Sequence, residues 1–358
     1  FLASIALSFL VANPFEIYFG EVLMRFRLVV LLLPVLLFGK EKEKPGKNPA
    51  WPPKAGIKTS GIQIPFASLK SEAELTLEGV PTWLMAEGPT LVMPIGDKGT
   101  IARVGNRDNK AMDSWKGFDA PCGGVVSAFQ SLWVPDCKKQ SIARIDAKTG
   151  KVTASAGVGV GKAKLALAAT ADSVWVLSDE KGTLSRVDPA DNSVVSELRL
   201  GPSCNMVQFE QDALWVSCPA ENRLLRIDAK ANLVDKRIEV ATEPMSFAFG
   251  EGHFWVLGNK EGKVSKVDPK TFKVVATIET GVPMGNGSVA FGDGFVWVSA
   301  TGYPLTKIDA KTDKVVQQFA GEGGGLVRFV SGSVWLMNSG KATVSRFDPK
   351  RIAATLPD

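Results

Sequence analysis

The sequence has a single histidine, His253, among 358 residues. Imidazole is the side chain most often used for proton transfer near neutral pH, and it is also the commonest ligand of zinc in proteins. Its scarcity disfavours histidine-dependent hydrolysis and the usual zinc sites. The sequence therefore favours a binding function over histidine-based catalysis.

The sequence also lacks basic clusters and long apolar runs. Its 42 Lys and Arg residues and 37 Asp and Glu residues give a net charge of +5 that is scattered along the chain. A nucleic-acid-binding protein usually gathers its positive charge on one face, so we predict no nucleic-acid partner. The apolar run 28–38 is interrupted by Pro34 and is shorter than the roughly 20 residues that cross a bilayer, so we predict no stable membrane span in the mature chain.

The N-terminal region has the pattern of an export signal. Arg25 and Arg27 follow Met24 and precede the apolar run 28–38, which suits the hydrophobic region of a secretory signal better than a buried core segment. We interpret residues 1–44 as an upstream segment and export signal with Met24 as the initiator. Residues 45–71, which continue a charged and proline-rich stretch, are predicted to be a linker. The mature protein is then periplasmic or secreted.

From residue 72 onward the sequence repeats with a period of about 40 residues. A Trp-led apolar pair recurs at spacings of 42, 40, 40, 42 and 38, and each pair is followed by a motif of a basic residue, an aliphatic or aromatic residue and Asp. The tryptophans are Trp133, Trp175, Trp215, Trp255, Trp297 and Trp335, and Leu91 stands in a degenerate first copy. Seven such units predict an all-β fold over residues 72–358, a seven-bladed β-propeller of four-stranded antiparallel blades.

One repeat shows how the pattern makes a blade. Residues 288–292 and 295–300 flank an Asp-Gly turn and are predicted to be the two inner strands, and the outer strands follow around Asp309, whose side chain can cap the turn after it. The basic residue before each such Asp is interpreted as a structural contact between blades, because it recurs in every complete copy. His253 lies in a turn between inner strands and is interpreted as a surface residue.

Closure of the ring needs an extra outer strand for the last blade. Residues 74–81 resemble the outer-strand segment 276–283 although they precede the first blade. They are therefore predicted to complete blade seven. The C-terminal residues 351–356 remain an alternative.

The four cysteines are predicted to form two disulfides, Cys122–Cys137 and Cys204–Cys218. Counted from the tryptophan of each repeat, Cys122 and Cys204 lie at −11, Cys137 at +4 and Cys218 at +3. If the turn is centred at −4, Cys204 and Cys218 lie directly opposite each other, and Cys122 and Cys137 do so with a bulge near Pro135. The alternative is a four-cysteine metal site, but no C-x-x-C motif is present.

The Asp-x-Lys-Thr-x-Lys-Val-Val phrase at 268–275 and 309–316 resembles the YVTN family of bacterial β-propellers. The chain is similar over residues 72–358 to that superfamily, which includes the streptogramin (virginiamycin B) lyases. The resemblance implies a propeller fold and, for a lyase, histidine, acidic residues and magnesium near one end of the channel. The positions that follow the Trp-containing strand here hold no histidine: they are Asp136, Asp179, Pro219, Asn259, Thr301 and Ser339.

Polar residues interrupt the repeat where blades begin and where the Trp-containing strands end. We interpret this set as the candidate mouth of the channel, although such residues can also merely cap loops: Asp136, Asp179, Asn205, Asn259, Asn286 and Asn338. The sequence favours a monomeric, non-catalytic binder of a small molecule, peptide or envelope component, without a cofactor. The alternative is a streptogramin-lyase-like lyase or hydrolase, with a divalent cation such as magnesium held by Asp136 and Asp179.

Overall fold

The computed structural model describes residues 55–160, 166–283, 287–338 and 340–352. All of them belong to the compact unit Lys47–Asp358. The predicted export signal with Met24, and the candidate residue Asn286, lie outside the described residues. None of the helices within these ranges is long and apolar enough to cross a membrane.

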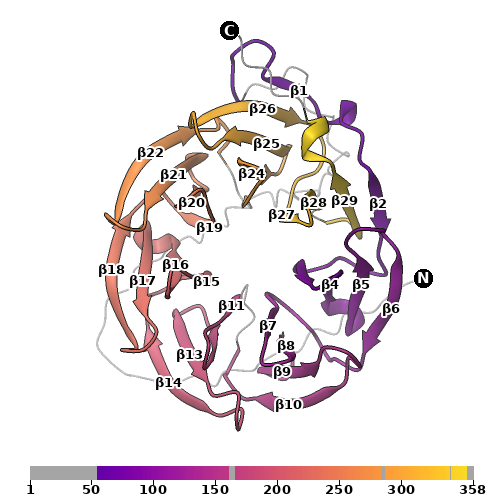
Figure 1. Ribbon diagram of the computed structural model, residues 1–358, viewed down its shortest axis with the longest axis vertical. Helices are drawn as coiled ribbons and strands as arrows, with labels where there is room; N and C mark the ends of the chain where they lie inside the picture. The colour runs from indigo at the N-terminus through magenta and orange to yellow at the C-terminus, as the bar shows by residue number, and fades with distance from the viewer. Residues whose placement is uncertain (1–54, 161–165, 284–286, 339, 353–358) are drawn as a thin grey trace, which may run out of the picture. The chain divides into compact units, whose positions relative to one another are not determined.

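Seven antiparallel sheets follow one another in a ring, which confirms the predicted seven-bladed propeller (Figure 1). Blade one contains β3 (Met85–Glu87), β4 (Thr90–Ile95), β5 (Thr100–Gly105) and β6 (Ala111–Lys116). Blade two contains β7 (Val126–Ala128), β8 (Ser131–Asp136), β9 (Ser141–Asp146) and β10 (Val152–Ala156). Blade three contains β11 (Ala166–Ala169), β12 (Val174–Leu177), β13 (Thr183–Val187) and β14 (Val194–Arg199).

The remaining blades repeat this order. Blade four contains β15 (Met206–Glu210), β16 (Ala213–Cys218), β17 (Arg223–Asp228) and β18 (Leu233–Glu239). Blade five contains β19 (Pro244–Gly250), β20 (His253–Gly258), β21 (Lys263–Asp268) and β22 (Lys273–Glu279). Blade six contains β23 (Ser288–Gly292), β24 (Phe295–Ala300), β25 (Tyr303–Asp309) and β26 (Lys314–Ala320), and blade seven contains β27 (Val327–Val330), β28 (Ser333–Met337) and β29 (Thr343–Phe347). Short 3-10 helices lie at η1 (Phe66–Ser68), η2 (Gly96–Lys98), η3 (Pro219–Glu221) and η4 (Pro349–Arg351).

The N-terminal part of the propeller closes the ring. Strand β2 (Ala73–Thr76) pairs antiparallel with β29 and becomes the outer strand of blade seven, as the sequence predicts (Figure 1). Strand β1 (Gln63–Pro65) adds a fifth, parallel strand to blade six by pairing with β26. Residues 63–65 fall within the range 45–71 predicted as a linker, and this part of the range is docked on a blade.

One indole is buried between neighbouring blades in six of the seven repeats. The six repeat tryptophans have 0% exposure, and Leu91 occupies the equivalent buried position in blade one. Three of the indole Nε1 atoms donate to the backbone carbonyl five residues earlier at 3.0–3.1 Å: those of Trp215, Trp255 and Trp297. Burial of the ring supplies hydrophobic stabilisation, and this hydrogen bond satisfies the buried polar atom.

The recurring basic residue makes scaffold contacts, and in some repeats it joins one blade to the next, whereas Arg186 and Arg226 pair with aspartates of their own blades. The Arg144 guanidinium donates to the carbonyl oxygen of Pro189 in the following blade at 2.6 Å, and Lys266 Nζ donates to that of Ala310 at 3.1 Å. Each of the two basic groups also lies over the indole opposite it in its own blade. These side chains are therefore occupied by contacts within the scaffold.

The aspartate of the same motif caps the turn that follows it. Asp146 accepts the backbone N–H of Thr149 at 2.7 Å, Asp228 that of Ala231 at 2.9 Å, and Asp268 that of Lys270 at 2.8 Å. These hydrogen bonds lower the pKa of all three carboxyl groups below the ordinary aspartate value. The carboxylate form is therefore favoured by folding.

This arrangement predicts an acid-sensitive fold. A carboxyl whose pKa is lower in the folded chain stabilises it above the unfolded pKa, about 3.9, and this contribution is lost as the pH falls through the folded value. We expect the melting temperature of the triple variant Asp146→Asn, Asp228→Asn, Asp268→Asn to fall less between pH 6 and pH 3 than that of the wild type, since Asn keeps the turn but does not titrate. Asp212→Asn, at an exposed turn, serves as control, and equal acid sensitivity of the triple variant and the wild type would contradict the prediction.

Candidate functional site

A cavity of about 490 Å³ lies where the blades begin and their Trp-containing strands end. Residues from the starts of blades one, two, four, five, six and seven contribute to its lining. Cys122 and Cys137 also line it, so we call this side of the propeller the disulfide-bearing face. The cavity lies on the side where the sequence predicts the channel mouth.

Three of the six predicted mouth residues line this cavity: Asn205, Asn259 and Asn338. The lining does not include Asp136 or Asp179. The structure thus brings together the amides of blades four, five and seven and leaves the two carboxylates outside.

The three amides differ in how far their hydrogen bonding is satisfied. Asn205 Oδ1 accepts a hydrogen bond from Ser217 at 2.8 Å, and Asn338 Nδ2 donates to Thr343 Oγ1 at 2.9 Å. Asn259 is 2% exposed, and its Oδ1 is buried without a hydrogen-bond partner in the described part of the chain. Because a buried polar atom normally has a partner, Asn259 differs from the other two amides in carrying an unsatisfied acceptor.

Arg328 is the charged residue of the cavity that sequence reasoning missed. It lies on β27, and its guanidinium carbon is 4.5 Å from the centroid of the Trp83 ring, which also lines the cavity. Its Nη1 donates to the carbonyl oxygen of Val327 at 2.9 Å, and no carboxylate of the described residues forms an ion pair with it. Burial lowers the pKa of Arg328 to about 10, so the group remains charged at neutral pH.

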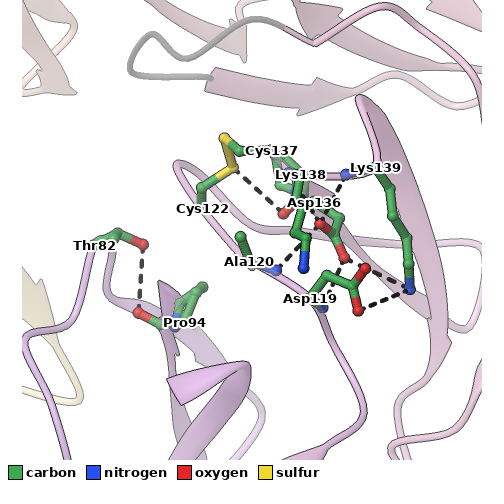
Figure 2. Close-up of a disulfide and its surroundings, with 10 residues drawn as sticks. Thr82, Pro94, Asp119, Ala120, Cys122, Asp136, Cys137, Lys138 and Lys139 are labelled. Atoms are coloured by element: carbon green, nitrogen blue, oxygen red, sulfur yellow. Dashed lines mark hydrogen bonds and ion pairs between the residues drawn. A yellow bond between two sulfur atoms is a disulfide. The ribbon is translucent and has the colours of Figure 1, made fainter. Parts of the chain in front are cut away.

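Asp136 is a structural cap beside the first disulfide. Its carboxylate accepts the backbone N–H groups of Asp119 at 3.1 Å and of Ala120, Lys138 and Lys139 at 3.2 Å each, and Figure 2 shows these contacts converging on it. The residue is 3% exposed, and Lys139 Nζ lies 3.8 Å from Oδ2. Both carboxylate oxygens are thus engaged by the protein.

Asp179 is held in a similar way on the following blade. Its two oxygens accept the N–H and the Oγ1–H of Thr183, each at 2.8 Å, and Arg199 lies 3.6 Å away. Burial raises the pKa of the Asp179 carboxyl, but the hydrogen bonds from Thr183 and the charge of Arg199 outweigh it and keep the value below normal. Both carboxylates are thus engaged within their own loops, and the magnesium that the lyase alternative expects at Asp136 and Asp179 stays a prediction.

Both predicted disulfides are present, Cys122–Cys137 and Cys204–Cys218. Their register differs from the expectation. Val126 pairs with Trp133 and Gln208 with Trp215, so in both hairpins the residue seven before the tryptophan lies opposite it, and Cys204 and Cys218 are offset by one residue. Near the first disulfide the register shifts further, since Pro121 bridges to Asp136 and the Cys122 N–H donates to the carbonyl oxygen of Pro135. Cys122 and Cys137 are therefore also offset from each other.

The reason for the changed register is the turn between the inner strands. In blade four both turn residues, Gln211 and Asp212, have positive φ, which is the conformation of a two-residue type I′ turn. Such a turn is centred between two residues, half a residue later than the turn centre at −4 predicted from the sequence.

Groups that could transfer protons are scarce around the cavity. Among the described residues, its lining contains no histidine, aspartate, glutamate or lysine. The hydroxyl oxygens of Ser246 and Ser288 accept the backbone N–H groups of Val289 and Val327 on the next blades, at 3.2 and 3.3 Å. His253 starts β20 at the turn end of the blade, and its Nδ1 lies 2.7 Å from the carbonyl oxygen of Glu251.

The fold and this cavity define a seven-bladed propeller with a pocket at one end of the ring. Among solved structures, it is similar to selenomethionine-substituted virginiamycin B lyase from Staphylococcus aureus, with a TM-score of 0.65, 12% identity, and coverage of 76% of this chain and 97% of the lyase. A streptogramin B lyase matches with a TM-score of 0.64, 12% identity and coverage of 76% and 96%. A catalytically inactive histidine-to-alanine variant of the Staphylococcus aureus enzyme with quinupristin matches with a TM-score of 0.63, 14% identity and coverage of 76% and 97%.

At this level of identity the likeness shows the fold alone. No protein-family model matches the sequence, and no curated protein matches it. The YVTN resemblance of the repeat phrase therefore stays a prediction.

The hydrogen bonds of Asp136 predict a structural role that can be measured. Asp136→Ala leaves four backbone N–H groups without their acceptor and should lower the free energy of unfolding by about 2–3 kcal/mol. Asp179→Ala, at a more exposed carboxylate with fewer donors, should cost less than half as much. Denaturant unfolding of the oxidised proteins measures both values, and an Asp136→Ala protein as stable as the wild type would rule out this role.

Proposed function

We propose that this chain is an exported, non-catalytic propeller that binds a small molecule in the cavity on the disulfide-bearing face. The observation that carries the proposal is the composition of the lining. It joins apolar side chains such as Trp83, Met245 and Met337 to a few polar ones, Asn205, Asn259 and Arg328. Concave sites of 300–1,000 Å³ with this mixture are typical of small-molecule binding.

The same lining argues against catalysis in this cavity. General acid–base catalysis needs a titratable group within hydrogen-bond reach of the reacting atom. The described lining offers hydroxyls that already bond to neighbouring blades, and the two candidate carboxylates are engaged in loop caps. The fold is shared with streptogramin lyases, but we do not propose lyase activity for this chain, because the described lining lacks histidine and carboxylates.

Export is supported by two independent features. Disulfides persist in oxidising compartments, and both cysteine pairs are bonded in this structure. The basic flank and apolar run around residues 24–38 have the pattern of a secretory signal. A periplasmic or secreted location follows from this proposal.

Blocking the cavity should abolish binding without unfolding the propeller. Thr82 is exposed at the rim and lines the cavity, so Thr82→Trp places an indole across it. We expect native mass spectrometry of the exported wild type to detect a bound small molecule that the Thr82→Trp protein lacks. Lys270→Trp, at an exposed turn between outer strands, is the matched control and should retain the molecule.

The competing enzymatic function has its own measurement. Incubation of the wild type with quinupristin, followed by liquid chromatography and mass spectrometry, should leave the compound unchanged. Conversion of quinupristin, or equal retention of the bound molecule by the Thr82→Trp and wild-type proteins, would contradict the proposed function.

A further inference from the structure

The charge of the cavity is unbalanced. Among the described lining residues Arg328 is the one charged side chain, and no carboxylate accompanies it. Removing a charge from water without a partner costs free energy, so buried or half-buried charges are usually paired. The scaffold leaves this guanidinium without the partner that such positions normally have.

Arg328 is also a departure from the repeat. It pairs across the inner hairpin with Trp335, and in the other six blades the residue at this register position is uncharged. Four of those residues are alanine, and the full set is Ala86, Val126, Ala168, Gln208, Ala248 and Ala290. A small residue satisfies the scaffold there, so the blade architecture does not require an arginine in blade seven.

The other basic residues of the repeat show what a structural arginine does here. Arg144, for example, donates hydrogen bonds to Ser131, Pro189 and Phe129. Within the described chain, Arg328 donates a hydrogen bond to Val327 alone. Since a guanidinium carries five N–H groups, most of its donors remain for another acceptor.

The contact with Trp83 orients the Arg328 N–H groups that have no acceptor within the described chain. The indole lies against the guanidinium at 4.5 Å from carbon to ring centroid, as in a cation–π pair. A stacked guanidinium keeps its N–H groups at its edges, where a planar carboxylate can accept two of them at once.

The other lining residues suit an uncharged, apolar group attached to such a carboxylate. Trp83, Met245 and Met337 offer apolar and polarisable surface, which adapts to irregular shapes. Asn259 adds a buried carbonyl oxygen that lacks a donor. An apolar or aromatic group joined to an N–H donor complements both features.

We propose that the cavity selects small carboxylic acids that carry an apolar body and a hydrogen-bond donor, with Arg328 binding the carboxylate while stacked on Trp83. The inference rests on the proposed binding function and deepens it. N-acylated amino acids with an aromatic side chain are the simplest compounds of this class. Their carboxamides are neutral and nearly the same size.

The test compares N-acetylphenylalanine with N-acetylphenylalanine amide in ligand-observed NMR titrations at pH 7. We expect the acid to bind the wild type at least tenfold more tightly than the amide, a difference of about 1.4 kcal/mol. Arg328→Gln should bring the two affinities within about twofold, chiefly by weakening the acid. Arg328→Lys should give an intermediate ratio, since it keeps the charge but loses the two-pronged geometry.

Two controls separate the loss of the Arg328 contact from a change in overall charge and from unfolding. Arg223→Gln removes the same charge from an exposed position on β17 and should leave the ratio unchanged. Thermal melting of each variant reports whether the propeller is folded. If Arg328→Gln does not fold, the Arg328→Lys ratio decides, and a wild-type ratio in that variant overturns the inference.

The outcomes distinguish this inference from the proposed function. A preference for the acid that survives Arg328→Gln overturns the role of Arg328. Equal binding of acid and amide to the wild type, abolished for both by Thr82→Trp, overturns acid selection and leaves the proposed function standing. If neither compound binds at about 10 mM, a concentration at which even very weak affinity is detected, the inference is overturned. The mass-spectrometric comparison of the wild type with Thr82→Trp then tests the proposed function separately.

Discussion

The packing of one sheet face against the next is the constraint on which this propeller depends. Each sheet packs against a neighbour on either face, so every repeat must present apolar surface to both neighbours, and the six fully buried tryptophans are the largest side chains in this contact. The fit is close enough that a Cβ added at Gly250 would lie 2.0 Å from the ring of Phe291, and one at Gly292 2.0 Å from that of Phe329. Glycine in these strands is therefore a requirement of sheet-to-sheet contact, as is expected where another element approaches closely.

The fold could be read from the sequence because its strongest signal is local and repeated. Trp-led pairs and the motifs that end in Asp recur at a spacing of about 40 residues, and each repeat specifies its own hairpins. Consecutive repeats then form consecutive blades. Two features depended on more than the repeat pattern. The partner of residues 73–76 is decided by which blade has a free edge, and the register of Cys204 and Cys218 by turn residues with positive φ that lack the usual Asn-Gly sequence.

Only some residues of the candidate site could be predicted from the sequence. Asn205, Asn259 and Asn338 stood out because they break the repeat at strand ends, and the structure places them around one cavity. Asp136 broke the repeat equally, yet its carboxylate turns into its own loop to meet backbone N–H groups, a choice that sequence spacing does not encode. Arg328 was missed because its contrast with the alanines of other blades appears only after the hairpin register is known.

The pairing of β2 with β29 joins segments about 270 residues apart in the chain. Contacts of such high sequence separation carry a large loop-closure cost and form late, whereas the hairpins within each blade are local. The wall of the cavity includes Trp83 from the start of blade one and Arg328 from blade seven, so its two sides meet only after this last pairing. A folding intermediate can therefore hold a string of finished blades and still have no cavity, so the cavity is complete only when the ring has closed.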